Sequence, residues 1–264
     1  MIKIAVSGAT GRMGRMIIEA VLAAEDAQLF AAVTAPGAEG IGQDAAAFLG
    51  KSTGVVITDD LSSIVGADVL IDFTRPEATL SYLPFCAEHG IGMVIGTTGF
   101  DAQGRACIEE TAQKIPVVFA PNMSVAVNAA FCLIEKAAAL LKDYDCEIVE
   151  MHHKHKVDAP SGTALEMGRR VAKAREQRFE DIAVLSREGH TGERKPGTIG
   201  FAALRGGDVV GDHTVIFAGV GERIEITHKS GSRASYAQGA VTAARFILKR
   251  KNGLFSMADV LGLS

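Results

Sequence analysis

The sequence predicts an α/β protein, with a first domain built on a parallel sheet and a smaller α+β domain with a mixed sheet after it. In the first 123 residues, short apolar runs alternate with segments of helical spacing. Continuous apolar strands separated by helices are typical of βαβ units whose sheet is covered on both faces. Further along the chain the apolar runs follow one another closely and short glycine turns join them, which is typical of antiparallel or mixed sheets.

The elements of the first domain follow from the apolar runs and from the residues that end them. Gly8 closes the first run, and Pro76 suits the first turn of a helix because it lacks the N–H that a helix start leaves unpaired. Residues 36–58 are too rich in glycine and alanine for an assignment. We expect strands at 3–7, 29–33, 67–73, 92–95 and 117–119, and helices at 12–24, 76–89 and 101–114.

The second domain begins with a long helix, and another helix follows its last strand. Because a helix after the second sheet is able to pack back on the first, we expect a discontinuous first domain of residues 1–123 and 233–264. Residues 124–232 then form the second domain. The elements expected after residue 123 are helices at 125–141, 163–177 and 233–251 and strands at 144–152, 199–204, 209–218 and 223–228.

Composition argues against several classes of protein. The 264 residues are 48% hydrophobic and carry a net charge of −4, which argues against a nucleic-acid partner bound through bulk electrostatics. No signal peptide is visible and no apolar stretch approaches the ~20 residues that span a bilayer, so we expect a cytoplasmic protein without a membrane partner. The four cysteines form no CxxC pair and suit buried, reduced thiols; they are Cys86, Cys107, Cys132 and Cys146.

A glycine-rich turn joins the first expected strand to the first helix. Its spacing is GxxGxxG, from Gly8 through Gly11 to Gly14. Glycines in this place permit a tight turn and let backbone N–H groups approach a pyrophosphate at the helix N-terminus. The alternative is a plain strand–helix turn that needs a single glycine. We predict a Rossmann-type domain whose dinucleotide contacts Gly8, Ala9, Thr10, Gly11, Arg12 and Met13.

The choice of coenzyme stays open. A Rossmann-type fingerprint predicts an acidic residue about 20 positions further on, at the end of the second strand, where it holds the ribose hydroxyls. Thr34 and Ala35 occupy this place, and neither a carboxylate nor an arginine stands beside them. We therefore expect Thr34 to contact the coenzyme, and we predict NADPH or NADH without a choice between them.

Three further loops follow the carboxyl ends of expected strands, where ligands bind in open α/β sheets. Arg75 is able to meet a phosphate from the loop at 73–76. For Thr98 and Asn122 an equal alternative is a helix N-cap, a role that Thr and Asn often take. The coenzyme contacts predicted in these loops are Arg75, Gly96, Thr97, Thr98, Ala120, Pro121, Asn122 and Met123.

Residues 152–156 bring three histidines and two lysines together. Such a group of cationic side chains is costly unless an anion neutralises it. Ser161, Gly162 and Thr163 follow at an expected helix start, whose exposed N–H groups and hydroxyls suit a substrate carboxylate or a phosphate. Imidazoles transfer protons near neutral pH, and a lysine supplies an ammonium. The stretch therefore suits reduction of a C=N or conjugated C=C bond in a small dicarboxylate, with the proton from a Lys or His side chain.

Two other interpretations of this stretch exist. Three histidines within four residues are able to ligate zinc, but there is no cysteine partner or HExxH spacing, and neighbours on a strand point to opposite faces. A solvated basic loop is the second, since short charge runs are usually hydrated. We expect no metal site.

The same stretch resembles the signature of a known family, the 4-hydroxy-tetrahydrodipicolinate reductases, formerly called dihydrodipicolinate reductases. Further segments agree in the family's order and span nearly the whole chain: the glycine turn, IDFTRP at 71–76, GTTGF at 96–100 and APNMSVAVN at 120–128. The residues that carry the resemblance are His152-His153-x-x-Lys156-x-Asp158-Ala159-Pro160-Ser161-Gly162-Thr163-Ala164.

The resemblance implies an activity and a set of roles. The family reduces 4-hydroxy-tetrahydrodipicolinate, the cyclic product of the aspartate-semialdehyde/pyruvate condensation, to tetrahydrodipicolinate in the diaminopimelate route of lysine biosynthesis. It uses NADH or NADPH and is a cytoplasmic homotetramer, formed through the sheet of its substrate-binding domain. The implied roles are proton donor and acceptor for His152, proton donor for Lys156, and substrate-carboxylate contacts for His153, Gly162 and Thr163.

This chain departs from the family's pattern at one place that concerns the coenzyme. Many members carry an acidic residue followed by Arg where this chain has Thr34 and Ala35. The resemblance therefore implies a nicotinamide coenzyme but not which one.

Other functions fit less well. A short-chain dehydrogenase needs a Tyr-x-x-x-Lys pair, and no tyrosine of this chain has lysine at that spacing. An aldehyde-type dehydrogenase needs a nucleophilic cysteine in a cleft, whereas all four cysteines lie in expected helices or strands. The remaining alternative is a non-catalytic dinucleotide-binding regulatory protein, which explains the glycine turn but gives the His–Lys stretch no purpose.

Overall fold

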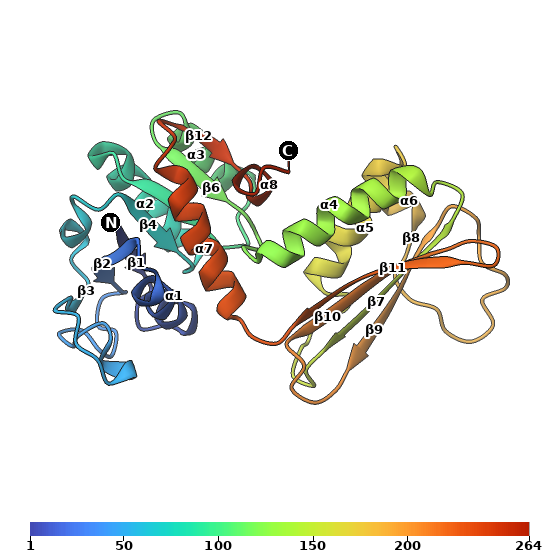
Figure 1. The fold of residues 1–264 in the computed structure, drawn as a ribbon, viewed down its shortest axis with the longest axis horizontal. Coiled ribbons are helices and arrows are strands. Elements are labelled where there is room, and N and C mark those ends of the chain that lie inside the picture. The colour runs from blue at the N-terminus through green and yellow to red at the C-terminus, as the bar shows by residue number, and fades with distance from the viewer. Residues whose placement is uncertain (264) are drawn as a thin grey trace. The chain divides into compact units, whose positions relative to one another are not determined.

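The computed structural model describes residues 1–263, which form two compact units (Figure 1). The first unit contains Met1–Val125 together with the segment from Ala234 onward, and the second contains Ala126–Arg233. The last long helix, α7 (Ala234–Ile247), therefore belongs to the first unit although it follows the second in sequence. Each unit has a hydrophobic core of its own.

The first unit is built on a seven-stranded sheet in which every neighbouring pair is parallel. Its order is β12-β6-β5-β4-β1-β2-β3. Apart from the edge strand β12, this is the strand order of a Rossmann fold. Strands are added on one side of β1 up to β3 and on the other side from β4 onward, so the order reverses between β1 and β4. The strands are β1 (Ile2–Ser7), β2 (Ala27–Val33), β3 (Ile57–Thr58), β4 (Val69–Asp72), β5 (Gly92–Ile95), β6 (Pro116–Phe119) and β12 (Gly253–Phe255).

Helices cover both faces of this sheet, because its strands are apolar on both sides. Ile4 and Val6 of β1 face a core that includes α1 and α7, whereas Ala5 between them faces a core that includes α2 and α3. Figure 1 shows α7 running beside the sheet in this unit. The other long helices of this unit are α1 (Arg12–Ala23), α2 (Pro76–His89) and α3 (Ala102–Ala112).

Several short elements were not expected from the sequence. In the segment left unassigned, Asp44 organises a loop by accepting hydrogen bonds from the backbone N–H groups of Ala46, Thr53 and Gly54, each at 2.8 Å. A loop held by one side chain has no hydrophobic periodicity, so pattern analysis cannot find it. The short elements of this unit are β3, β12, the 3₁₀ helices η1 (Ala47–Leu49) and η2 (Leu61–Ile64), and α8 (Met257–Val260).

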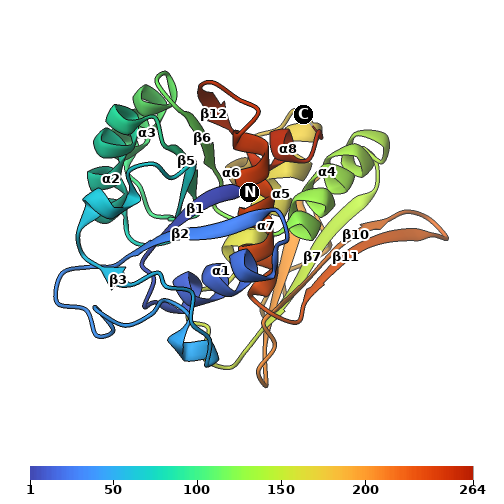
Figure 2. The ribbon, with the colours of Figure 1, turned by 60° about the vertical axis from the view of Figure 1, so that its left-hand side comes forward.

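The second unit is a five-stranded sheet with helices on one face. Its order is β11-β10-β7-β9-β8; β10 runs antiparallel to both neighbours, and β9 is parallel to β7 and β8. The sheet is therefore mixed, and the predicted fold class is confirmed. Figure 2 shows β10 and β11 as a long hairpin. The elements are α4 (Val125–Leu140), whose first residue is assigned to the first unit, β7 (Asp145–His152), α5 (Gly162–Ala174), α6 (Phe179–Ile182), β8 (Ala183–Val184), β9 (Ile199–Arg205), β10 (Gly211–Ala218) and β11 (Arg223–Ser230).

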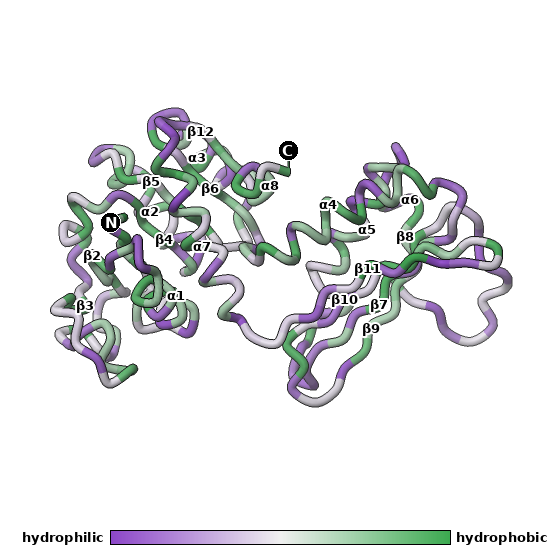
Figure 3. The backbone as a smooth tube through the Cα atoms, in the orientation of Figure 1, coloured by the Kyte–Doolittle hydropathy of each residue, from purple (hydrophilic) through white to green (hydrophobic). Residues whose placement is uncertain are grey.

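The core of the second unit lies between its sheet and its helices. Ile148 and Phe217 point from β7 and β10 toward Ile134 of α4 and Met167 of α5. Buried and partly exposed residues alternate along β7 and β10, so the other face of these strands is not buried. Figure 3 shows the consequence for hydropathy: β5 and β6 are mostly hydrophobic, whereas β10 and β11 are mixed.

Candidate active site

The turn between β1 and α1 has the close backbone packing that a dinucleotide requires. Gly8 has a positive φ of 60°, which L side chains rarely adopt. A Cβ added to Gly14 would lie 2.1 Å from the Gly8 carbonyl oxygen, so the third glycine lets the helix approach the turn. No side chain caps the N-terminus of α1 at Gly11, and its first turn holds no acidic residue. Uncapped N–H groups at a helix start suit a pyrophosphate.

The turn also contacts the end of β2, where a Rossmann domain has the residue that binds the adenosine ribose. The hydroxyls of Thr10 and Thr34 lie 3.0 Å apart, so two predicted contacts are in direct contact. Thr34 is only 7% exposed, and the following Ala35 is exposed. The predicted Arg12 opens α1 and is exposed as well. Neither Thr34 nor Ala35 offers the charge that would choose a coenzyme.

Asp72, at the end of β4, is a residue that sequence reasoning missed. It is fully buried, and its carboxylate accepts hydrogen bonds from the hydroxyls of Ser7 at 2.6 Å and Thr97 at 3.1 Å. The hydroxyls of Thr74, at 2.6 Å, and Thr79 donate to it as well. The end of β1 and the loops after β4 and β5 are thus joined at the point where the strand order reverses. A carboxylate at the end of an apolar strand was the signal that could have revealed it.

The structure divides the predicted loop residues into two kinds. The hydroxyl of Thr97 is occupied, because it donates to Asp72 and accepts from the N–H of Thr74 at 2.9 Å. Arg75 and Thr98 are exposed. Asp101 caps α3 through the N–H of Gly104 at 2.7 Å, so the N-cap alternative for Thr98 is wrong.

The loop after β6 is packed more deeply. Ala120 and Met123 are 4% and 1% exposed. Asn122 accepts a hydrogen bond from the N–H of Ser124 at 2.9 Å, in a turn that precedes the first residue of α4. A Cβ at Gly239 of α7 would lie 1.8 Å from the Met123 carbonyl oxygen, so this glycine lets α7 pack against the loop. Gly96 is half-buried against Phe73, and Pro121 is exposed.

In the second unit, His152 is the last residue of β7 and lies in a polar cluster. His152 is 9% exposed, and its Nδ1 lies 2.6 Å from a carboxylate oxygen of Glu150, which is 2% exposed. Arg205 of β9 binds both oxygens of that carboxylate, at 2.8 and 2.9 Å. Sequence reasoning missed Glu150 and Arg205. The signal for Glu150 was present, because residues two apart on a strand share a face.

A second buried histidine, also missed, lies beside the first. The rings of His152 and His213 meet edge to face, with centroids 5.0 Å apart. Nε2 of His213 is 2.9 Å from the Ser161 hydroxyl. Burial, aided by the neighbouring His152, lowers the pKa of His213 from 6.5 to about 4, so this ring is neutral near pH 7.

The start of α5 is as predicted in position but not in every detail. Ser161 is 2% exposed; its hydroxyl caps the helix by accepting from Ala164 N–H, and its own N–H donates to Glu150 at 3.1 Å. The expectation of an exposed hydroxyl is therefore wrong for Ser161. Gly162 is exposed and Thr163 partly exposed.

The cationic side chains of the loop between β7 and α5 differ in their exposure to solvent. The Lys156 ammonium is 2.7 Å from Asp158, and the Lys156 side chain is 19% exposed. His153 is half-buried, whereas Lys154 and His155 are exposed, as a solvated loop would have them. Within residues 1–263 no group of three or more His, Cys, Asp or Glu side chains is arranged to hold a metal ion.

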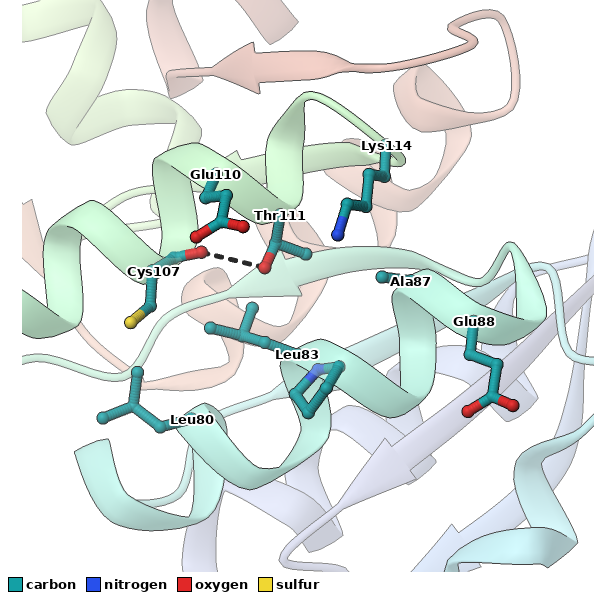
Figure 4. A pocket seen from close by; sticks show the side chains of 9 residues that line it. Leu80, Leu83, Ala87, Glu88, Cys107, Glu110, Thr111 and Lys114 are labelled. Carbon is teal, nitrogen blue, oxygen red and sulfur yellow. Dashed lines mark hydrogen bonds between the residues drawn. The ribbon is translucent and has the colours of Figure 1, made fainter.

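The cysteines lie in helices and strands, as expected, and none is paired, but Cys107 and Cys132 are only partly buried, so the expectation of buried thiols is wrong for these two. Burial raises the pKa of Cys86 and of Cys146 to about 12, so neither is a thiolate near pH 7. Cys107 lies in a groove between α2 and α3 that contains none of the predicted site residues (Figure 4). No helix within residues 1–263 has the length and apolar character to cross a membrane.

Comparison with known families decides what this arrangement is. Residues 2–123 match the model of the N-terminal part of dihydrodipicolinate reductase, and residues 126–261 match the model of its C-terminal part. The chain belongs to the dihydrodipicolinate reductase family. The two matches cover both units, including the His–Lys stretch at residues 152–156. A non-catalytic dinucleotide-binding protein would have no need of this stretch.

Relatives in this family are similar over their full length. The 4-hydroxy-tetrahydrodipicolinate reductase of Cupriavidus pinatubonensis is 61% identical over 262 residues, which cover 98% of this chain and 99% of the relative. The enzyme of the same name from Burkholderia multivorans is 60% identical over 263 residues, 99% of each chain.

Solved structures agree with the fold. A dipicolinate-bound dihydrodipicolinate reductase from Paenisporosarcina sp. TG-14 superposes with a TM-score of 0.79 at 24% identity, covering 98% of both chains. A probable dehydrogenase from Thermotoga maritima has a TM-score of 0.61 at 14% identity, covering 99% of this chain and 93% of its own.

Proposed function

We propose that this chain is an NAD(P)H-dependent oxidoreductase that reduces 4-hydroxy-tetrahydrodipicolinate to tetrahydrodipicolinate in the diaminopimelate route of lysine biosynthesis. In the balanced reaction the substrate, NAD(P)H and one proton yield tetrahydrodipicolinate, NAD(P)⁺ and water. The observation that carries the proposal is the segment from His152 to Thr163, which joins proton-transfer groups to an anion-binding helix start within a chain of this family. We place the reaction in the cytoplasm.

The first unit is proposed to bind the coenzyme, which supplies the hydride when bound. The close packing of Gly14 against Gly8 and the uncapped start of α1 support a pyrophosphate at this turn. We propose Thr10, Arg12 and Thr34 as contacts near the adenosine ribose, because the end of β2 binds this sugar in a Rossmann domain and Thr10 lies 3.0 Å from Thr34. The further contacts that we propose are Ala9, Gly11, Met13, Arg75, Gly96, Thr97, Thr98, Ala120, Pro121, Asn122 and Met123.

The second unit is proposed to bind the substrate. We assign proton donation to Lys156 and proton exchange to His152. His153, the Thr163 hydroxyl and the N–H groups of Gly162 and Thr163 hold the substrate carboxylates, because a helix start attracts anions. Ser161 acts at this site through its neighbours, since its hydroxyl and its N–H are both occupied.

A homotetramer formed through the sheet of the second unit is part of the proposal. The face of β7, β9 and β10 opposite the helices of this unit carries Val149, Met151, Leu204 and Ile216, and Leu204 is 50% exposed. Partly exposed apolar side chains on an open sheet face favour association with another surface. Light scattering should therefore give four times the chain mass of 27.7 kDa, and Leu204→Glu should reduce it. An unmodified chain that is monomeric at micromolar concentration would refute the tetramer.

A complementation experiment tests the function in a cell. A bacterium whose own reductase gene has been deleted needs added diaminopimelate to grow. Expression of this chain should remove that need, and expression of His152→Ala with Lys156→Ala should not, although both proteins accumulate equally. Continued dependence on diaminopimelate with abundant, folded wild-type chain would contradict the proposal.

A further inference from the structure

Glu150 contacts two parts of the proposed substrate site at once. One oxygen of its buried carboxylate lies 2.6 Å from Nδ1 of His152. The other accepts the backbone N–H of Ser161 at 3.1 Å, next to the proposed carboxylate-binding turn. The same side chain therefore connects the proposed proton-transfer group to the proposed anion-binding helix start.

Arg205 keeps this carboxylate charged. Its guanidinium donates to both oxygens, at 2.8 and 2.9 Å, and it also donates to the backbone carbonyl of Asp158 at 2.7 Å. Desolvation opposes ionisation of Glu150, but the hydrogen bonds from Arg205 and His152 outweigh it and hold the pKa of Glu150 below its ordinary value. A paired, hydrogen-bonded carboxylate is the form that tolerates such burial.

The donors around Glu150 decide which nitrogen of His152 carries the proton. An ionised carboxylate only accepts hydrogen bonds, and the neutral imidazole has one N–H. Nδ1 must therefore carry it, which leaves Nε2 as the nitrogen that accepts or delivers a proton. Gly211 borders that atom: a Cβ there would lie 2.9 Å from Nε2 of His152. Glycine at this position keeps the space beside Nε2 open.

We propose that Glu150, clamped by Arg205, is a positioning residue that holds His152 as the Nδ1–H tautomer and fixes the Ser161 turn, so that Nε2 faces the substrate with the correct protonation. The inference rests on the proposed function of this site. It assigns to Glu150 no contact with substrate; its effect reaches the reaction through His152 and Ser161.

The substitution Glu150→Gln keeps the shape of the side chain but removes its negative charge and one of its two accepting oxygens. The amide replaces one accepting oxygen by an NH₂ group, which then faces Arg205 and either Ser161 N–H or His152 Nδ1–H, all of them donors. If the amide faces His152, Nδ1 becomes an acceptor and the proton moves to Nε2. The ring of His213, from β10, also meets the His152 ring, edge to face.

Ring-nitrogen NMR of the full chain with isotope-labelled histidine reads the tautomer without an activity assay. The His152 signals are assigned by their loss in His152→Gln. In the neutral ring, wild-type His152 should be the Nδ1–H form, and Glu150→Gln should contain the Nε2–H form. Glu147→Gln is the matched control, because Glu147 lies on the same strand and is likewise paired with arginine, in its case Arg187 and Arg194. It should leave the His152 tautomer unchanged.

Kinetics complete the test. Glu150→Gln should lower kcat by at least about tenfold; complete loss of general acid–base catalysis typically costs ~10²–10⁴-fold. Glu150→Asp, which keeps an acceptor-only carboxylate, should recover part of the rate and the wild-type tautomer. An Nε2–H form in the wild-type protein would overturn the inference whether or not the variants fold. Normal tautomers with an inactive wild-type chain would instead refute the proposed function.

Discussion

The ammonium of Lys156 lies 2.7 and 2.8 Å from the two carboxylate oxygens of Asp158, two residues further along the loop. Asp158 is 58% exposed, so water screens this ion pair. Exposed pairs typically contribute ~0–1 kcal/mol, so little free energy holds Lys156 to Asp158. A substrate carboxylate or a developing anion therefore competes easily for the ammonium, which suits a proton donor that must move to its substrate.

Lys156→Ala should mainly lower turnover. Loss of general-acid assistance typically costs ~10²–10⁴-fold in rate, and steady-state kinetics with saturating coenzyme measures it. Lys154→Ala is the matched control, because Lys154 belongs to the same loop but is exposed. Near wild-type turnover in the Lys156 variant, or an equal loss in the Lys154 variant, would remove Lys156 from the mechanism.

Thr163→Val should raise KM more than it lowers kcat. Thr163 is proposed to grip a substrate carboxylate in the ground state and the transition state alike, and loss of such uniform binding raises KM. Thr163→Ser keeps the hydroxyl and should restore KM. A variant with unchanged KM and reduced kcat would show that the hydroxyl acts on the transition state or only on the structure.

The chain should accept both coenzymes, with a preference below about tenfold, since tenfold needs about 1.4 kcal/mol. No carboxylate at the end of β2 repels a 2′-phosphate. Arg12 is exposed at the start of α1, and Arg15 stacks on Phe48, so their attraction is that of solvent-exposed charges. NADPH should be slightly preferred. Hundredfold discrimination in kcat/KM in either direction would contradict this account.

A carboxylate introduced at the end of β2 should shift the preference toward NADH. Thr34→Glu is the direct substitution, but Thr34 is buried and bonded to Thr10, so the exposed Ala35 is the better position. Ala35→Glu should lower kcat/KM for NADPH and spare NADH, because the 2′-phosphate is repelled. Gln28→Glu, exposed near the other end of β2, is the control. Equal changes in kcat/KM for both coenzymes would mean that the 2′-phosphate does not bind near residue 35.

His213 should make the protein less stable in mild acid. Its pKa is about 4 when folded against an ordinary 6.5, so between these values the unfolded chain binds a proton that the folded chain excludes. The stability is complete above about pH 6.5 and is lost as the pH falls toward about 4, by on the order of 3 kcal/mol. Urea unfolding should show a smaller acid loss in His213→Gln than in wild type. His190→Gln, an exposed control, should behave as wild type, and equal losses in all three would disprove the assignment.

Most of the fold could be predicted because its elements carry strong local signals. Pro76 and Gly90 bracket α2, whose bounds are as expected, and the apolar runs of β4 and β5 belong to a sheet covered on both faces. The short elements β3, β8 and β12 carried no such signal. They are two or three residues long, too short for any periodicity to register.

The candidate site was predicted where residues are consecutive in sequence and missed where they are not. His152 and Lys156 stand in one motif, whereas Arg205 is 55 residues from Glu150 and His213 is 52 from Ser161. These partners meet because β9 and β10 both pair with β7, a relationship that only the sheet order reveals. The same holds for Asp72, which joins hydroxyls from the end of β1 and from the loops after β4 and β5.

The central claim is the reductase activity, and coenzyme oxidation by the purified chain tests it most directly. The substrate is made in the cuvette from pyruvate and aspartate semialdehyde by the preceding condensing enzyme, and the absorbance of the reduced nicotinamide is followed. The account predicts rapid oxidation of NADPH and of NADH that requires both precursors, the condensing enzyme and this chain, and that falls at least about 10²-fold with Lys156→Ala. No oxidation above the background without the chain, with either coenzyme and with the condensation shown to proceed, would contradict it.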